Sequence, residues 1–385
     1  MRFADNRNKI GKYIPAVVFL IFIYGMALWF IFSPKPDYSS SEKRYLQKFP
    51  EVTAEKLLSG DFGSEFEIFF ADRFPQRNTW VGLNAYTALA EGNNGASGVY
   101  NCKNGYLINK PVSTENNLDK NIGAVADFAK SIDTPTTVML VPSTGYIVDD
   151  VLPTFHDKYN DDEDISRISS TLSKDKIGFV DLRERFKSEY KNGSQLYYKT
   201  DHHWTTKGAY TGYQELCKAL GITPIDDSTL KKDSYPDFYG TTYSSSGFWL
   251  TPPDNIEIWN NPKNSDRNIS VKITEGANIK TSGSMYFTDH LKEDDKYPVF
   301  IDGNHALTEI TNTNAKNGTI LLIKDSFSHS LAPFLAENYS KVVLVDLRYY
   351  KESVSDLVTT YNPEQVVVLY GIDNLATDTD IVWLK

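Results

Sequence analysis

Residues 319–328 read TILLIKDSFS, which joins a strand-like run to the start of a helix. The β-branched and apolar residues at 319–323 are typical of a strand buried on both faces. The pattern then alternates to the C-terminus, with helical candidates at 330–338 and 354–361 and further apolar strands at 341–345 and 365–369. Strand–helix–strand–helix–strand predicts a mainly parallel sheet covered by helices on both faces, an α/β fold.

Polar residues follow the ends of these predicted strands. Ser326, Asp346, Arg348 and Gly371 each come just after an apolar run. Functional loops of parallel sheets gather at the carboxyl ends of the strands, so we expect these residues to share one rim. Ser326, at a strand-to-helix turn, is the candidate nucleophile, and a helix cap is its alternative role.

A second segment with several potentially catalytic side chains is TDHHWT at residues 200–205. Histidine is scarce, with six in the chain, and two of them follow an aspartate here. In an extended backbone Asp201 and His203 point the same way and His202 points away. A carboxylate beside an imidazole fixes its tautomer, so Asp201 would orient His203 as the base for Ser326. A structural hydrogen bond in a buried turn is the alternative.

Three other roles stay open at this stage. His202 is expected to be structural, and Trp204 either walls a sugar-binding pocket or packs in the core. A metal site made of Asp201, His202, His203 and His329 is disfavoured, because adjacent histidines point apart in a strand and no His-x-x-x-His or cysteine pair supports it. We therefore expect no metal and no cofactor.

The N-terminus predicts membrane attachment. Residues 13–32 read YIPAVVFLIFIYGMALWFIF, about 20 uncharged residues, enough for a membrane helix over Tyr13–Phe32. Basic residues precede it, namely Arg2, Arg7, Lys9 and Lys12. Positive charge stays in the cytoplasm, which predicts a single-pass protein of the cell membrane whose C-terminal domain is extracellular. A cleaved signal peptide is the alternative.

Changes in composition and clusters of turn-forming residues divide the rest of the chain into segments. The formal charge of −10 over 385 residues argues against a nucleic-acid partner. We predict a cytoplasmic tail at 1–12, the membrane helix at 13–32, a tether and helical segment at 33–95, and an α/β domain at 96–385 with a loop-rich insertion at about 221–316. Asp72, Arg73 and Arg77 are expected to form salt bridges. The sequence leaves open whether Cys102 and Cys217 pair.

Within the predicted α/β domain, local patterns also indicate a hairpin at 99–108, helices at 116–131, 165–172 and 206–220, and strands at 136–142 and 178–182.

Several motifs together resemble a known family. They are EKRYLQKFP at 42–50, DRFPQR at 72–77, DHHW at 201–204, KDSFS at 324–328 and VDLRYY at 345–350. They resemble the DHHW family of bacterial membrane-anchored extracellular proteins, which is similar to the SGNH-hydrolase-like alginate O-acetyltransferases AlgJ and AlgX. The resemblance implies an SGNH-like three-layer sandwich with Asp201, His203 and Ser326 as a catalytic triad, in the order found in the alginate relatives.

The resemblance also implies a reaction. An extracytoplasmic O-acetyltransferase would act on a cell-surface polysaccharide through an acetyl-serine, with acetyl groups supplied by a membrane-bound partner of the MBOAT type. Two positions depart from the family pattern: Lys324 stands where a glycine is common, and His329 where an asparagine is common. We expect the Ser326 N–H, Arg348 and His329 to be candidate oxyanion donors. A carbohydrate esterase with the same triad, or a non-catalytic polysaccharide-binding or assembly protein, are the alternatives.

Overall fold

The computed structural model describes residues 13–113 and 117–384. The basic residues predicted to lie before the membrane helix (2–12) are outside the described residues. The chain divides into two compact units, residues 1–84 and residues 85–385. Each unit is described by itself.

The first unit begins with the long apolar helix α2 (Ile14–Phe32). Its mean hydropathy is 2.4 and none of its residues is buried. Its length and composition suit a membrane span or a signal sequence equally. It is followed by β1 (Tyr38–Ser39), β2 (Arg44–Tyr45), α3 (Ala54–Ser59) and α4 (Asp61–Asp72), and α5 (Arg77–Ala90) runs on into the second unit.

Salt bridges hold the segment after α2 together. Asp72 is buried and accepts two hydrogen bonds from the Arg44 guanidinium, at 2.6 and 2.9 Å. Arg77 pairs with Glu42 at 2.8 Å, and the buried Arg73 pairs with Asp37 at 3.0 Å. The salt-bridge set predicted from Asp72, Arg73 and Arg77 is thus confirmed.

The second unit is built around an eight-stranded sheet with the order β11-β10-β12-β14-β13-β15-β6-β7. The strands are β6 (Thr136–Val141), β7 (Gly178–Asp181), β10 (Ile269–Glu275), β11 (Asn278–Ser282), β12 (Leu307–Asn312), β13 (Asn317–Lys324), β14 (Tyr339–Val345) and β15 (Gln365–Gly371). Strands β14, β13, β15, β6 and β7 are parallel, and β12, β10 and β11 extend the sheet antiparallel. The predicted mainly parallel sheet is confirmed.

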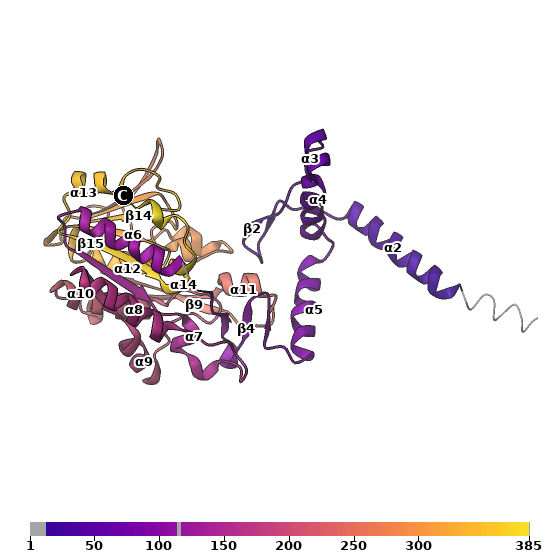
Figure 1. The fold of residues 1–385 in the computed structure, drawn as a ribbon, viewed down its shortest axis with the longest axis horizontal. Coiled ribbons are helices and arrows are strands. Elements are labelled where there is room, and N and C mark those ends of the chain that lie inside the picture. The colour runs from indigo at the N-terminus through magenta and orange to yellow at the C-terminus, as the bar shows by residue number, and fades with distance from the viewer. Residues whose placement is uncertain (1–12, 114–116, 385) are drawn as a thin grey trace, which may run out of the picture. The chain divides into compact units, whose positions relative to one another are not determined.

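Helices cover both faces of this sheet (Figure 1). Alternate residues of each strand feed opposite cores, so that Leu322 packs in one core and Leu321 in the other, both fully buried. The first core includes residues of α7 (Thr144–Ile147), α9 (Arg183–Lys191), α10 (Thr206–Leu220) and α12 (Ser328–Leu335). The second includes residues of α6 (Asn117–Ser131), α8 (Asp161–Lys174), α13 (Val354–Tyr361) and α14 (Ile372–Thr377). The fold is therefore the three-layer sandwich that the sequence predicts.

The remaining elements flank the sandwich. A three-stranded antiparallel sheet contains β3 (Gly95–Ala96), β4 (Val99–Asn101) and β5 (Leu107–Asn109), and a two-stranded one contains β8 (Lys231–Phe238) and β9 (Asp254–Asn260). The short helices are α11 (Thr241–Ser246), η1 (Lys103–Gly105), η2 (Asp149–Val151), η3 (Asp227–Thr229), η4 (Thr288–Lys292), η5 (Tyr297–Val299) and η6 (Ile381–Trp383). Residues 221–316, predicted as a loop-rich insertion, contain strands β8–β12, and three of these extend the central sheet. Cys102 and Cys217 are both buried, free thiols.

The carboxyl ends of the parallel strands form one edge at which the chain changes direction. From β13 the chain passes through α12 to β14 on one side, and later returns to β15 on the other side. Such a topological switch point is where α/β sheets place their ligand sites. Ser326 follows β13 at this point, Ser143 follows β6, and Gly371 ends β15.

A substitution in the centre of this sheet tests the fold. Leu322→Ala removes a fully buried side chain of β13, and we expect the free energy of unfolding of the full chain to fall by about 2–5 kcal/mol. Leu250→Ala is the control, because Leu250 is 83% exposed, and should change it by less than about 0.5 kcal/mol. Urea unfolding in detergent micelles, followed by tryptophan fluorescence, measures both. Equal effects would mean that β13 is not central.

Candidate active site

A tight turn, rather than an extended strand, brings Asp201 and His203 together. Tyr197 and Trp204 pair as an isolated antiparallel bridge, and the residues between them bend back. Asp201 Oδ1 accepts hydrogen bonds from the backbone N–H of His203 at 2.8 Å and from its Nδ1 at 2.5 Å. The expected alternation of an extended backbone is therefore wrong, because an aspartate that bonds two residues ahead makes the turn itself.

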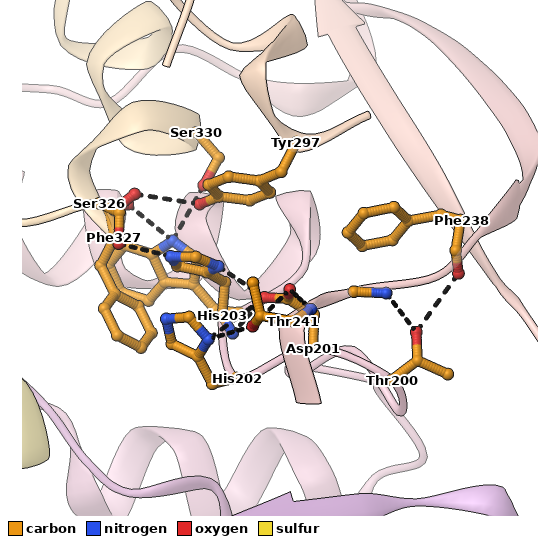
Figure 2. A network of polar contacts seen from close by, with 12 residues as sticks. Thr200, Asp201, His202, His203, Phe238, Thr241, Tyr297, Ser326, Phe327 and Ser330 are labelled. Atoms are coloured by element: carbon orange, nitrogen blue, oxygen red, sulfur yellow. Dashed lines mark hydrogen bonds and ion pairs between the residues drawn. The ribbon is translucent and has the colours of Figure 1, made fainter. Parts of the chain in front are cut away.

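The imidazole of His203 links this turn to Ser326 (Figure 2). Its Nε2 lies 2.6 Å from Ser326 Oγ, 123 positions further along the chain. Because Nδ1 carries the proton donated to Asp201, Nε2 is left to accept from the serine hydroxyl. All three side chains are buried, with Ser326 the most exposed at 8%. An acid, a base and a hydroxyl thus form one hydrogen-bonded chain.

Asp201 is held as a carboxylate. Burial favours its neutral form, but His203, His202 and hydrogen bonds from neighbouring donors outweigh this and lower the pKa of Asp201 well below its usual range. Its Oδ2 accepts from the Thr241 N–H at 2.7 Å and from the Thr241 hydroxyl at 3.1 Å. Figure 2 shows Thr241 beside Asp201 and His202. The negative charge therefore faces donors, which is what stabilises an imidazolium next to it.

Gly240 closes the backbone over Asp201. A Cβ at Gly240 would lie 2.1 Å from Asp201 Cβ and 2.4 Å from its Oδ2. The Gly240 backbone has φ −89°, which any residue adopts, so the constraint is space and not conformation. Only glycine lets the chain pass this close to the carboxylate.

Tyr297 covers the imidazole. Its ring stacks on that of His203 with centroids 4.0 Å apart and planes 9° apart, and its hydroxyl donates to the Ser326 carbonyl at 3.1 Å. Tyr297 and Thr241 both come from residues 221–316, and the sequence analysis identified neither. No motif or spacing marks them, since each is a single residue at the start of a short helix.

The turn that carries Ser326 is fixed by Asp325. One carboxylate oxygen accepts from the Phe327 N–H at 2.9 Å, and the other from the Gly371 N–H at 2.8 Å and Asn374 Nδ2 at 2.7 Å. Burial raises the pKa of Asp325. Asp325 thus ties the end of β13 to the end of β15 and sets where the serine stands.

Trp204 supports the same turn from behind. It is fully buried, and its indole N–H lies 3.0 Å from the Phe327 carbonyl and 2.9 Å from Ser330 Oγ. It therefore packs in the core and does not wall a pocket. His202 is half-buried and its Nδ1 lies 2.6 Å from Thr241 Oγ1. Burial, together with His203, lowers the pKa of His202 to about 4, so this ring is neutral at neutral pH.

Behind β13 lies a buried charge network. Lys324 Nζ donates to Asp346 Oδ2 at 2.9 Å and to His329 Nε2 at 2.8 Å. Arg348 donates to Asp346 at 2.6 and 2.8 Å and to Asn304 at 2.9 Å. Burial lowers the pKa of Lys324, although Asp346 opposes this. Burial and Lys324 lower the pKa of His329 well below its usual range, so its ring is neutral.

The tautomer of His329 follows from its partner. An ammonium group only donates, so Nε2 of His329 accepts from Lys324 and its proton sits on Nδ1. That Nδ1 is buried and has no hydrogen-bond partner within the described part of the chain.

Comparison with known proteins now identifies the family. Residues 112–345 match the family model described as DHHW protein. The chain belongs to the DHHW family. The family predicted from the sequence motifs is thus confirmed, and no curated protein matches the sequence significantly.

Solved structures with the same fold are similar to this DHHW protein at low sequence identity. A DHHW family protein from Eubacterium siraeum is 17% identical with a TM-score of 0.63, covering 75% of this chain and 95% of the other. Bacillus cereus PatB1, solved with a sulfonyl adduct, is 20% identical with a TM-score of 0.61, covering 74% and 97%. A weaker likeness is to the O-acetyltransferase domain of Pseudomonas putida AlgJ, at 14% identity and a TM-score of 0.48, covering 75% and 95%.

The oxyanion donors predicted for this DHHW protein differ in availability. Among the residues that the structure describes, none accepts a hydrogen bond from the Ser326 N–H, which stands at the turn before α12. The Arg348 guanidinium is bound to Asp346 and Asn304. The Ser326 N–H and the Nδ1–H of His329 therefore have no acceptor among the described residues, whereas the Arg348 guanidinium is already bound.

The ligand atoms of Asp201, His202 and His203 lie within 4.8 Å of one another. Most of them are already used in hydrogen bonds: Asp201 Oδ1 and His203 Nδ1 bind each other, and His203 Nε2 faces Ser326. His202 Nδ1 is bound to Thr241. Asp201, His202 and His203 thus form one hydrogen-bonded group with Thr241 and Ser326.

The close approach at Gly240 gives a first test of the site. Gly240→Ala must displace Asp201, so we expect the esterase turnover of p-nitrophenyl acetate to fall by roughly two orders of magnitude or more. Gly123→Ala is the matched control, since a Cβ there meets nothing within 4 Å and lies in α6, and its turnover should equal that of the unchanged chain. Wild-type turnover in Gly240→Ala would show that the position of Asp201 does not matter.

The buried network behind β13 gives a second test. Asp346→Asn leaves the Lys324 ammonium buried without its counter-charge, so we expect the free energy of unfolding to fall by about 3–5 kcal/mol. Asp289→Asn is the control, because Asp289 forms its ion pair with Lys292 at the surface, where such pairs contribute about 0–1 kcal/mol. Urea unfolding at neutral pH compares them. A loss no larger than that of the control would mean that Lys324 is neutral or finds another partner.

Proposed function

We propose that this protein is an extracytoplasmic O-acetyltransferase that acts on hydroxyl groups of a cell-surface polysaccharide. The observation that carries the proposal is the hydrogen-bonded chain from Asp201 Oδ1 through both ring nitrogens of His203 to Ser326 Oγ, at 2.5 and 2.6 Å. Groups in this order at these distances are those of a serine nucleophile with its base and orienting acid.

The first half of the reaction forms an acetyl-serine. His203 Nε2 takes the proton of Ser326, and Oγ attacks the carbonyl carbon of an acetyl ester. The carbonyl oxygen becomes an oxyanion that the Ser326 N–H is placed to bind. His203 then gives its proton to the leaving oxygen as the C–O bond breaks, and the acetyl group stays on Ser326. Asp201 stabilises the imidazolium throughout and keeps its own charge.

The second half transfers the acetyl group to a sugar. A hydroxyl of the acceptor gives its proton to His203 Nε2, and its oxygen attacks the acetyl carbon. The bond between the acetyl carbon and Ser326 Oγ then breaks as Oγ regains a proton from His203. Water in the place of the sugar gives hydrolysis with the same residues. Esterase activity is therefore the second candidate, and the two differ only in whether the site binds a sugar and keeps water out.

Membership in the DHHW family and the likeness to PatB1 support a common scaffold, and the PatB1 structure carries a sulfonyl adduct. A sulfonyl electrophile is therefore a direct chemical probe of Ser326 here.

The proposal includes the side of the membrane on which the reaction takes place and the source of the acetyl group. Helix α2 would anchor the chain, with the α/β domain outside the cell membrane. A single membrane helix cannot form a transport path, so acetyl groups from the cytoplasm require a multispanning partner, which we propose to be of the MBOAT type.

Removal of the nucleophile tests the proposal. Ser326→Ala should lower p-nitrophenyl acetate turnover by the full chain in detergent by about three orders of magnitude or more, and abolish labelling by a sulfonyl fluoride. Ser170→Ala, an exposed serine of α8, is the matched control and should behave as wild type. Absorbance of p-nitrophenolate and intact-protein mass spectrometry provide the two measurements.

Other outcomes would identify the alternatives. Equal turnover of wild type and Ser326→Ala would remove the catalytic claim, and glycan affinity unchanged by the substitution would then indicate a binding or assembly protein. Loss of activity with a chelator would indicate a metal site. Hydrolysis without transfer to any added sugar would indicate an esterase.

A further inference from the structure

A cavity of about 50 Å³ lies directly beside the triad. His202 and Phe327 form its wall on the catalytic side, and their rings lie 3.9 and 5.0 Å from the ring of His203. The opposite walls come from residues that follow β6 and β15, among them Ser143 and Asp373. The reaction described above uses none of these opposite walls.

Two carboxyl groups belong to that end of the cavity: the half-buried Asp373 lines it, and the buried Asp161 contacts Ser143, which also lines it. Ser143 donates its N–H to Asp161 at 2.7 Å, and its hydroxyl lies 3.1 Å from an oxygen of Asp373. Burial, together with Asp373, raises the pKa of Asp161 to about 7, and burial raises the pKa of Asp373 to about 6. Within the described residues, no lysine or arginine forms an ion pair with either carboxyl. The pair therefore carries acidic character without a cation to balance it.

An unpaired hydroxyl lines the same cavity. Thr242 is 2% exposed, and its Oγ1 has no hydrogen-bond partner in the part of the chain that the structure describes. A buried hydroxyl without a partner is costly, so a polar group of a ligand or a water is expected to meet it. This observation is independent of the carboxyl groups, and Thr242 and Asp373 both line this cavity.

We propose that this cavity is the acceptor subsite and that it receives a hydroxyl-bearing substituent of an uncharged sugar residue. The inference rests on the proposed acetyl transfer and adds the class of acceptor. A sugar hydroxyl can donate to Asp373 and bind Thr242 Oγ1, while the faces of Phe327 and His202 accept the C–H groups of the ring.

The negative charge of Asp373 excludes an acceptor that carries a negative charge at this position. A uronate carboxylate or a phosphate placed in this cavity would lie against Asp373, which no lysine or arginine pairs with among the described residues, and like charges in a partly buried site repel strongly. Polymers of uronic acids are therefore poor acceptors, and neutral sugars are good ones.

The experiment uses the full chain in detergent with p-nitrophenyl acetate as the acetyl donor. The two acceptors are methyl glucoside and methyl glucuronide, which differ at C6, where the first has a neutral hydroxymethyl group and the second a carboxylate. Mass spectrometry of the sugars and p-nitrophenolate release give the ratio of transfer to hydrolysis for each acceptor. This ratio is independent of how active each preparation is.

We expect wild type to favour the glucoside over the glucuronide by at least about tenfold. Asp373→Asn removes the charge and should shrink that preference by about tenfold through improved transfer to the glucuronide. Thr242→Val keeps the shape, removes the hydroxyl and should lower the transfer ratio for the glucoside by about three- to tenfold. Asp289→Asn, an exposed surface carboxylate, is the control with wild-type values.

The outcomes separate this inference from the proposed function. No turnover of p-nitrophenyl acetate by wild type would overturn both. Turnover that depends on Ser326, with an acceptor preference unchanged by Asp373→Asn and Thr242→Val, would overturn the subsite alone. A wild-type preference for the glucuronide, or no transfer to either sugar, would do the same. Melting temperatures of the variants show whether a loss of transfer comes from misfolding. If Asp373→Asn does not fold, the transfer ratio of Thr242→Val tests the subsite by itself.

Discussion

The imidazole of His203 is the single group on which the rest of the site depends. Both ring nitrogens are bound, one to Asp201 and one to Ser326, so one tautomer and one ring orientation are selected. Two features make this arrangement effective. The stacked ring of Tyr297 keeps water away from one face of the imidazole, and the donors around Asp201 keep that buried carboxyl ionised. Burial without those donors would protonate Asp201 and leave the imidazolium without its counter-charge.

Ser326 is positioned by the sheet and not by its own loop. Asp325 binds the backbone of β15 from the end of β13, and Trp204 binds the carbonyl of Phe327 from the segment that carries Asp201. Lys324, one residue before Asp325, reaches Asp346 at the end of β14. Lys324 and Asp325 therefore connect the end of β13 to both neighbouring strands. A glycine in place of Lys324 could make no such tie, so the buried ion pair with Asp346 depends on the lysine at this position.

The sequence predicted the parts of this structure that have a local signature. Strands β13, β14 and β15 are buried on both faces and therefore appear as continuous apolar runs. Asp201, His203 and Ser326 stand out because histidine is scarce and because the serine follows such a run. The reason for pairing Asp201 with His203 was wrong, since the turn makes the contact and strand alternation does not.

Other parts had no local signal. Tyr297 and Thr241 reach the triad from the starts of two short helices, and nothing in their neighbourhood distinguishes them from other polar and aromatic residues. Strand β10 alternates apolar and polar residues, whereas β12, with the sequence LTEITN, has only two apolar residues. The place of both in the sheet depends on the pairing of β12 with the distant β14. The cavity beside the triad depends on strand order in the same way, because Ser143 and Asp373 are 230 positions apart.

The order of the strands also sets the distances across the site. Ser326, Gly371 and Ser143 follow three neighbouring strands, β13, β15 and β6. Adjacent strands are about 4.8 Å apart, so Ser326 and Ser143 follow strands that are separated by roughly 10 Å across the sheet. The cavity of about 50 Å³ lies at this edge, lined by Ser143, Phe327 and Gly371. In the proposed transfer, an acceptor held there by strand ends would have its hydroxyl fixed relative to the acetyl carbon, and such fixed geometry would favour an attacking sugar over a diffusing water.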